Sequence, residues 1–96
     1  MTRIKVRELV WDQRNVEHIK KHNVNQQEIH VSIRNAAYHK KAHSGRYLMV
    51  GRTDKRIITV ILRRLQPTMY YLVTARDANK KERRDVYEKE GKSKKK

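Results

Sequence analysis

The sequence predicts a single α+β domain with the order strand, two helices, three or four strands, helix. Three observations predict it. Residues 12–22 and 25–35 each begin with a capping residue and carry apolar side chains at helical spacing. Three apolar runs with short turns between them follow, at residues 46–53, 56–65 and 70–75, which is typical of an antiparallel meander. A basic segment with its own capping signal comes last. Segregated helices and strands of this kind form a layered α+β domain.

The charge of the chain restricts its partners. The 96 residues, enough for one domain, include 25 Lys and Arg against 10 Asp and Glu, for a net charge of +15. Such an excess favours a polyanion or an acidic protein as partner. There is no cysteine, which excludes a disulfide framework and a thiolate metal site. No apolar run approaches the roughly 20 residues of a membrane span, so we expect a cytoplasmic protein without membrane contact. We expect the domain to occupy residues 1–88 and residues 89–96 to form a disordered Lys-rich tail.

The first half reads as a strand and a helical hairpin. Residues 4–10 alternate apolar and charged side chains. Asp12 is a good N-cap for the first helix, which should end at His22 because Asn23 tolerates the left-handed conformation. The second helix begins with Asn25 and Glu28 at the spacing of a capping box and should end near residue 34 or 35.

The second half reads as a sheet. Residues 36–42 form a weak, polar strand that we expect at a sheet edge, and residues 43–45 form a turn. The run at 56–65 is the most apolar and is predicted to be central, with both faces buried for part of its length.

The stretch from residue 70 to residue 87 carries the most chemistry. A strand ends near Arg76, and Asn79 and Glu82 have the spacing of a capping box that starts a basic helix. A cation beside the N-terminus of a helix suits a phosphate. The alternative is an ordinary strand followed by a solvated surface helix.

Familiar enzyme signatures are missing from the sequence. His18 and His22 lie one helical turn apart, but a solvated histidine face explains them better than a metal site. With three glycines the chain offers no phosphate-binding loop, and its carboxylates read as capping residues. We therefore expect no metal and no cofactor.

RNA cleavage is the chemistry that the abundant residues can perform. The 2′-OH attacks the adjacent phosphate, and Arg, Lys, His and Tyr side chains can orient it, stabilise the added charge and move protons. Arg63 on the central strand either marks a groove beside the core or simply emerges at the strand end. The five tyrosines can stack on bases, although core packing is the commoner role.

Three segments in order resemble the BrnT family of toxins, within the RelE-like ribonucleases: residues 11–24, 45–53 and 72–88. The resemblance implies a RelE-like α+β fold with an antiparallel sheet and a metal-independent endoribonuclease of a type II toxin–antitoxin pair. It also implies an antitoxin as partner, with any contact to DNA made only through the antitoxin complex.

The resemblance also implies a site. Lys21 and His22 match the Lys-His of a family turn, and Arg76 matches an arginine that follows a strand. We expect Arg76 to be the main phosphate-stabilising group, followed by Arg63, with Lys21 or His22 shuttling a proton. The residues expected to bind RNA are Arg52, Lys80, Arg83, Arg84 and Tyr87.

Two other readings stay open. The chain is either a basic module that binds RNA or DNA without cutting it, or an inactive relative retained as a protein partner. Metal-free cleavage separates the toxin from both, and salt-dependent RNA binding separates the binding module from the protein partner.

Overall fold

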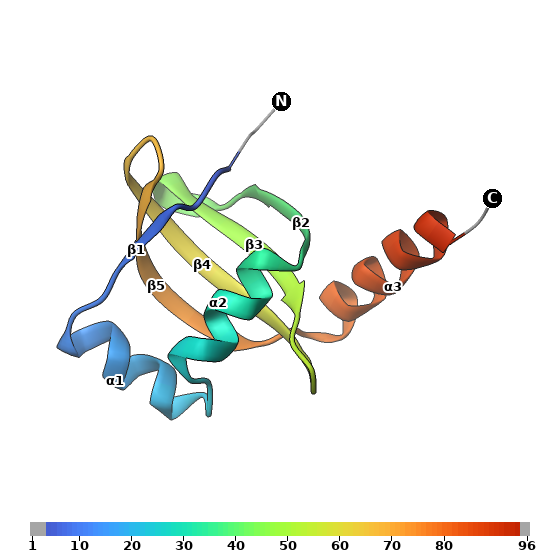
Figure 1. The fold of residues 1–96 in the computed structure, drawn as a ribbon, viewed down its shortest axis with the longest axis horizontal. Helices are drawn as coiled ribbons and strands as arrows, with labels where there is room; N and C mark the ends of the chain where they lie inside the picture. Colours follow the sequence, from blue (N-terminus) through green and yellow to red (C-terminus); the bar gives the residue numbers. More distant parts are fainter. Residues whose placement is uncertain (1–3, 95–96) are drawn as a thin grey trace.

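The computed structural model describes residues 4–94, which form a five-stranded sheet and three helices (Figure 1). The elements follow one another in the predicted order. They are β1 (Glu8–Val10), α1 (Gln13–Lys21), α2 (Gln26–Arg34), β2 (Ala36–Lys41), a 3₁₀ turn (His43–Gly45), β3 (Arg46–Arg52), β4 (Ile57–Gln66), β5 (Met69–Asp77) and α3 (Lys80–Lys94).

The sheet has the strand order β1-β5-β4-β3-β2. Strands β2 to β5 form an antiparallel meander, as predicted, whereas β1 pairs with β5 in parallel. Strand β1 is also shorter than the predicted strand over residues 4–10. The prediction that β4 is central is confirmed, and its burial is confined to its first part because its last four residues are exposed. The polar strand β2 lies at the sheet edge, also as predicted.

Both helices of the hairpin begin at the predicted caps. The side chain of Asp12 accepts the backbone N–H of Asn15 at 2.9 Å, and Asn25 accepts that of Glu28 at 2.8 Å. Asn23 adopts the left-handed conformation with φ 58°. Asn15 is buried, and its amide donates to Val10 O and to Leu72 O, which fixes the start of α1 against both β1 and β5. Local capping thus also sets the position of α1 on the sheet.

The two faces of the sheet carry separate cores. On the first face, Ile19 of α1 and Ile29 of α2 pack with even-numbered residues of β4 such as Ile58. On the second face, Val86 of α3 packs with odd-numbered residues such as Ile57. Figure 1 shows α2 lying over the sheet and α1 beyond the end of β1, beside β5, while α3 leaves one end of the sheet and projects away from it. Much of the second face is therefore left without a helix above it.

A buried carboxylate attaches α3 to the sheet. Glu82 accepts the Thr59 hydroxyl at 2.7 Å, the Asn79 N–H at 2.8 Å and the Arg76 guanidinium at 2.8 and 3.1 Å. Burial raises the pKa of Glu82, but the hydrogen bonds from Arg76, Asn79 and Thr59 outweigh burial and lower the pKa to about 2. The predicted capping box of Asn79 and Glu82 is confirmed, and it also connects α3 to β4 and β5.

Helix α3 continues to Lys94, which differs from the disordered tail predicted from residue 89. Glu90, within that segment, pairs with Arg52 at 2.6 Å. The extended part of the helix therefore has a charged partner on β3. The charge composition of the segment does not predict this contact. The last two residues of the predicted tail lie outside the described residues. None of the described helices is both long enough and apolar enough to cross a membrane.

Gly51 sets the distance between β3 and α2. A Cβ at this position would lie 1.9 Å from Ser32 O and 2.8 Å from Ser32 C, both backbone atoms of α2. Gly51→Ala is therefore expected to push α2 off the sheet and lower the free energy of unfolding by about 2–3 kcal/mol in urea titrations. Gly91→Ala is the matched control: a Cβ there has open space, so it should leave stability unchanged or raise it by up to about 1 kcal/mol. Equal stabilities of Gly51→Ala and wild type would contradict this packing.

The Glu82 carboxylate predicts a specific acid sensitivity. Its folded pKa of about 2 lies below the unfolded value of 4.5, so its contribution is fully present above pH 4.5 and is lost as the pH falls toward 2. That contribution is on the order of 3 kcal/mol. Urea titrations across this range should show a smaller loss of stability for Glu82→Gln than for wild type. Glu88→Gln, an exposed change on the same helix, should keep the wild-type acid sensitivity. Parallel pH curves for Glu82→Gln and wild type would show that the buried carboxylate contributes no differential stability.

Candidate functional site

The second face of the sheet is organised in cross-strand rows. Residues directly opposite in neighbouring strands share a face, and alternate residues along a strand return to that face. The register therefore gives three parallel rows on the second face: Tyr38, Val50, Thr59 and Arg76; then Lys40, Leu48, Ile61 and Thr74; then Arg46, Arg63 and Tyr71.

Exposure increases from the first row to the third. Thr59 in the first row is fully buried beneath α3, whereas Arg46 and Arg63 in the third row are exposed. Rows two residues apart are separated by about 7 Å, so the third row lies about 13 Å along the sheet from Arg76. We call the part beyond α3 the open face, defined by its side chains Arg46, Ile61, Arg63, Tyr71 and Thr74.

The third row combines two arginines with a tyrosine. Arg46 and Arg63 are direct cross-strand neighbours, an arrangement of like charges that costs stability unless an anion lies between them. The Arg63 guanidinium carbon lies 5.1 Å from the centroid of the Tyr71 ring. The Tyr71 hydroxyl donates to the Asp12 carboxylate at 3.0 and 3.1 Å. This row therefore holds a cation against an aromatic ring whose far end is fixed by hydrogen bonding.

Protonation states in this row follow from its contacts. The backbone N–H of Asn15 lowers the pKa of Asp12 more strongly than burial raises it, and the Tyr71 hydroxyl lowers it further. Burial and the neighbouring Asp12 raise the pKa of Tyr71. At neutral pH Asp12 is thus a carboxylate and Tyr71 a neutral phenol.

Arg76, the arginine expected from the sequence to stabilise phosphate, is engaged by Glu82. Both of its terminal nitrogens donate to that carboxylate, and one also donates to Asp77 O at 3.2 Å. Hydrogen bonding to Glu82 raises the Arg76 pKa more than burial lowers it. Its side chain is 36% exposed, so one side of the guanidinium still faces solvent at the edge of the open face.

Lys21 and His22 lie elsewhere. They end α1, which packs on the first face through Ile19, and Arg56 links the neighbouring Asn23 to Asp77, which follows Arg76. The His22 ring lies 5.3 Å from that of His18, centroid to centroid. Within residues 4–94, no group of three His, Cys, Asp or Glu side chains is arranged to hold a metal. The expected site residues therefore divide between the end of α1 and the strands β4 and β5 that carry Arg63 and Arg76.

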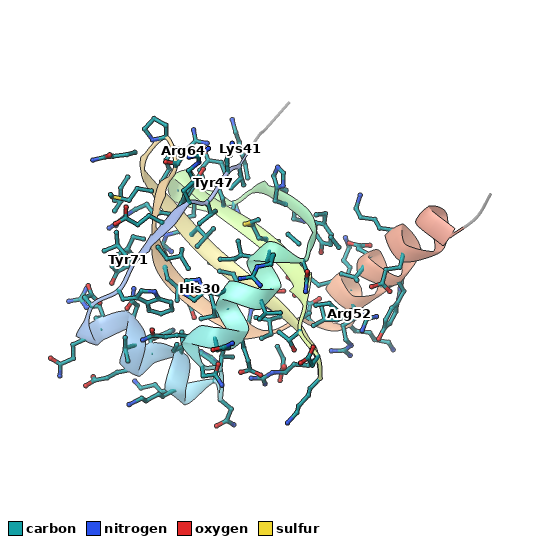
Figure 2. The ribbon with its side chains drawn as sticks, viewed as in Figure 1. His30, Lys41, Tyr47, Arg52, Arg64 and Tyr71 are labelled. Carbon is teal, nitrogen blue, oxygen red and sulfur yellow. The ribbon has the colours of Figure 1, made fainter. Side chains whose placement is uncertain are left out.

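The residues expected to bind RNA gather around α3, at the opposite end of the sheet from Tyr71 (Figure 2). Arg52 pairs with Glu90 and lies 5.7 Å from the centroid of the Tyr87 ring. Tyr87 is 54% exposed. The Arg83 side chain donates to Ala78 O at 2.6 Å. The remaining two, Lys80 and Arg84, are exposed on the same helix.

The sequence singles out Arg63 but does not predict its neighbours in the third row. Arg46 and Tyr71 come from different strands, and their position beside Arg63 depends on the strand register. That register includes irregularities in the β4–β5 pairing, between Ile61 and Leu62 and between Arg64 and Gln66. The sequence signals for a hairpin predict pairing but not such bulges. The alternation of Thr59, Ile61 and Arg63 was the available signal for the face itself.

The comparisons with known proteins give one informative match. No protein-family model matches the chain, and no curated protein sequence matches it either. The crystal structure of the Brucella abortus ribonuclease toxin BrnT matches with a TM-score of 0.62 and 18% sequence identity, over 76% of this chain and 97% of that chain. The predicted resemblance is thus confirmed at the level of the fold: this chain has a BrnT-like α+β fold.

Proposed function

We propose that this chain is a metal-independent endoribonuclease toxin of a type II toxin–antitoxin pair. The observation that carries the proposal is the fold shared with the BrnT ribonuclease toxin over almost the whole length of that protein. The net charge of +15 supports a nucleic acid as substrate. The open face supports it further, because it offers cations on a surface that no helix covers.

RNA is expected to bind across the third row. Arg46 and Arg63 repel each other when the face is empty, so a phosphate between them relieves that repulsion as well as forming two charge-assisted hydrogen bonds. The ion pairs among residues 4–94 include neither arginine. Arg76 then contacts a neighbouring phosphate from the edge of the face, through the side of its guanidinium that faces solvent.

The proposed reaction is a transesterification within the RNA chain. The 2′-oxygen forms a bond to phosphorus, the bond from phosphorus to the 5′-oxygen breaks, and the products end in a 2′,3′-cyclic phosphate and a 5′-hydroxyl. Arg63 and Arg46 stabilise the charge that the phosphorane gains. The proton of the 2′-OH leaves as the first bond forms, and the 5′-oxygen takes up a proton as the second breaks; we assign neither transfer to Lys21 or His22, which end α1. An antitoxin would neutralise the toxin by covering the open face.

Cleavage assays in EDTA test this proposal. Purified protein should cut single-stranded RNA with metal chelated, leaving 2′,3′-cyclic phosphate ends, and Arg63→Ala should lower the rate by about 100-fold. Lys20→Ala, an exposed change on α1, is the control and should cleave at the wild-type rate. Wild-type protein that binds RNA without cutting it, also when ribosomes are added, would identify a non-catalytic binding module instead.

Arg76 requires its own test because it also belongs to the Glu82 ion pair. Arg76→Ala is expected to lower cleavage by about 10- to 100-fold at a temperature where the variant is folded. Glu82→Gln removes the same ion pair but keeps the arginine, and should stay within about threefold of wild type. Equal losses for the two folded variants would show that Arg76 acts only by holding α3 in place.

A further inference from the structure

A second basic surface lies on the first face of the sheet, away from the open face. A groove of about 400 Å³ runs between the segment of residues 4–9 and α2, with Met49 of β3 among its walls. Figure 1 shows this segment crossing above the sheet beside α2. The groove is lined by Ile4, Lys5, Val6, Arg7, Leu9, His30, Ile33, Arg34 and Met49.

The groove has an aliphatic floor. Ile4, Val6, Leu9 and Ile33 are half-buried, and they pack against the core of the first face while one side remains accessible. Aliphatic surface that is accessible in a groove gains free energy when an apolar side chain covers it. Bases, in contrast, bind through stacking on aromatic rings, and His30 is the one aromatic residue among those that line this groove.

The groove also has a cationic rim. Lys5, Arg7, His30 and Arg34 are exposed, and no carboxylate lines the groove. None of the ion pairs among the described residues involves these four side chains. Arg52, Arg56 and Arg76 differ, since each pairs with a carboxylate. The positive potential of the groove is thus not neutralised within the part of the chain that the structure describes.

We propose that this groove binds an acidic amphipathic segment of a partner protein. Apolar side chains of the segment would cover the aliphatic floor, and its carboxylates would pair with Lys5, Arg7 and Arg34. The proposal goes beyond the ribonuclease function and does not depend on it, because no step of cleavage uses the first face. It has one direct consequence: the segment binds across the sheet from Arg63 and leaves the RNA-binding cations uncovered.

A designed peptide provides the probe. A fluorescein-labelled helical peptide of roughly 15 residues, with leucines along one face and glutamates on both flanks, is titrated into the ¹⁵N-labelled full chain. Amide shifts should change around Ile4, Val6, Ile33 and Met49, and not around Arg46 or Arg63. A peptide with serine in place of leucine keeps the charges and should bind at least about tenfold more weakly.

Charge-reversal variants complete the test. The double variant Arg7→Glu/Arg34→Glu should weaken peptide binding at least about tenfold, as measured by fluorescence anisotropy, while its thermal unfolding shows that it is folded. Lys20→Glu, a reversal on α1 outside the groove, should bind the peptide within about twofold of wild type. An oligouridylate of about 10 nucleotides serves as the competing ligand.

Three results would overturn the proposal. The first is the absence of peptide binding. The second is that the double variant and Lys20→Glu lose the same amount of binding free energy per reversed charge. This would show that the peptide is attracted nonspecifically to a basic protein. The third is that oligouridylate, and not the peptide, shifts the groove amides, which would make the groove a nucleic-acid site. None of these experiments measures RNA cleavage. A negative result in the peptide experiments therefore does not bear on the ribonuclease proposal, which is tested by the cleavage assays.

Discussion

The buried contact between Glu82 and its three donors determines much of this molecule. Thr59 supplies a hydroxyl from the central strand, Asn79 a backbone N–H from the helix start, and Arg76 a guanidinium from β5. A carboxylate with fewer partners would be costly at this depth. Because all three donors lie at one end of the sheet, α3 packs at that end and then projects outward. The rest of the second face stays open, and the same contact occupies much of Arg76.

The positions of the ten acidic residues decide which of the 25 Lys and Arg side chains are neutralised on the surface. Glu28, Glu82 and Glu90 pair with arginines near the ends of the strands where the chain turns or a helix docks. The third row of the open face and the rim of the groove on the first face have no such partners within residues 4–94. Both surfaces therefore carry uncompensated positive charge, and each is suited to an anionic ligand. The two surfaces differ in their apolar groups: Arg63 contacts an aromatic ring on the open face, whereas the groove on the first face has an aliphatic floor.

The local elements were predictable from the sequence because their signals are local. Asp12, Asn25 and Asn79 mark three helix starts, and the apolar run of β4 marks the central strand. The parallel pairing of β1 and the extension of α3 to Lys94 depend on contacts distant in sequence, such as the ion pair of Arg52 with Glu90, and were missed. The site was harder still. Resemblance grouped Lys21 and His22 with Arg76, whereas they end a helix that packs on the first face through Ile19. Arg46 and Tyr71 reach Arg63 only through the strand register.

We expect RNA to bind on the open face, and mapping the binding of an RNA that cannot be cleaved tests this placement. A single-stranded RNA with 2′-O-methyl ribose at each position cannot undergo 2′-OH attack, so it can be titrated into the ¹⁵N-labelled chain without turnover. We expect amide shift changes centred on Arg46, Arg63 and Tyr71, and these changes should become smaller as the salt concentration is raised. Changes centred on Lys21 and His22, or on the groove beside α2, with the third row unaffected, would contradict it.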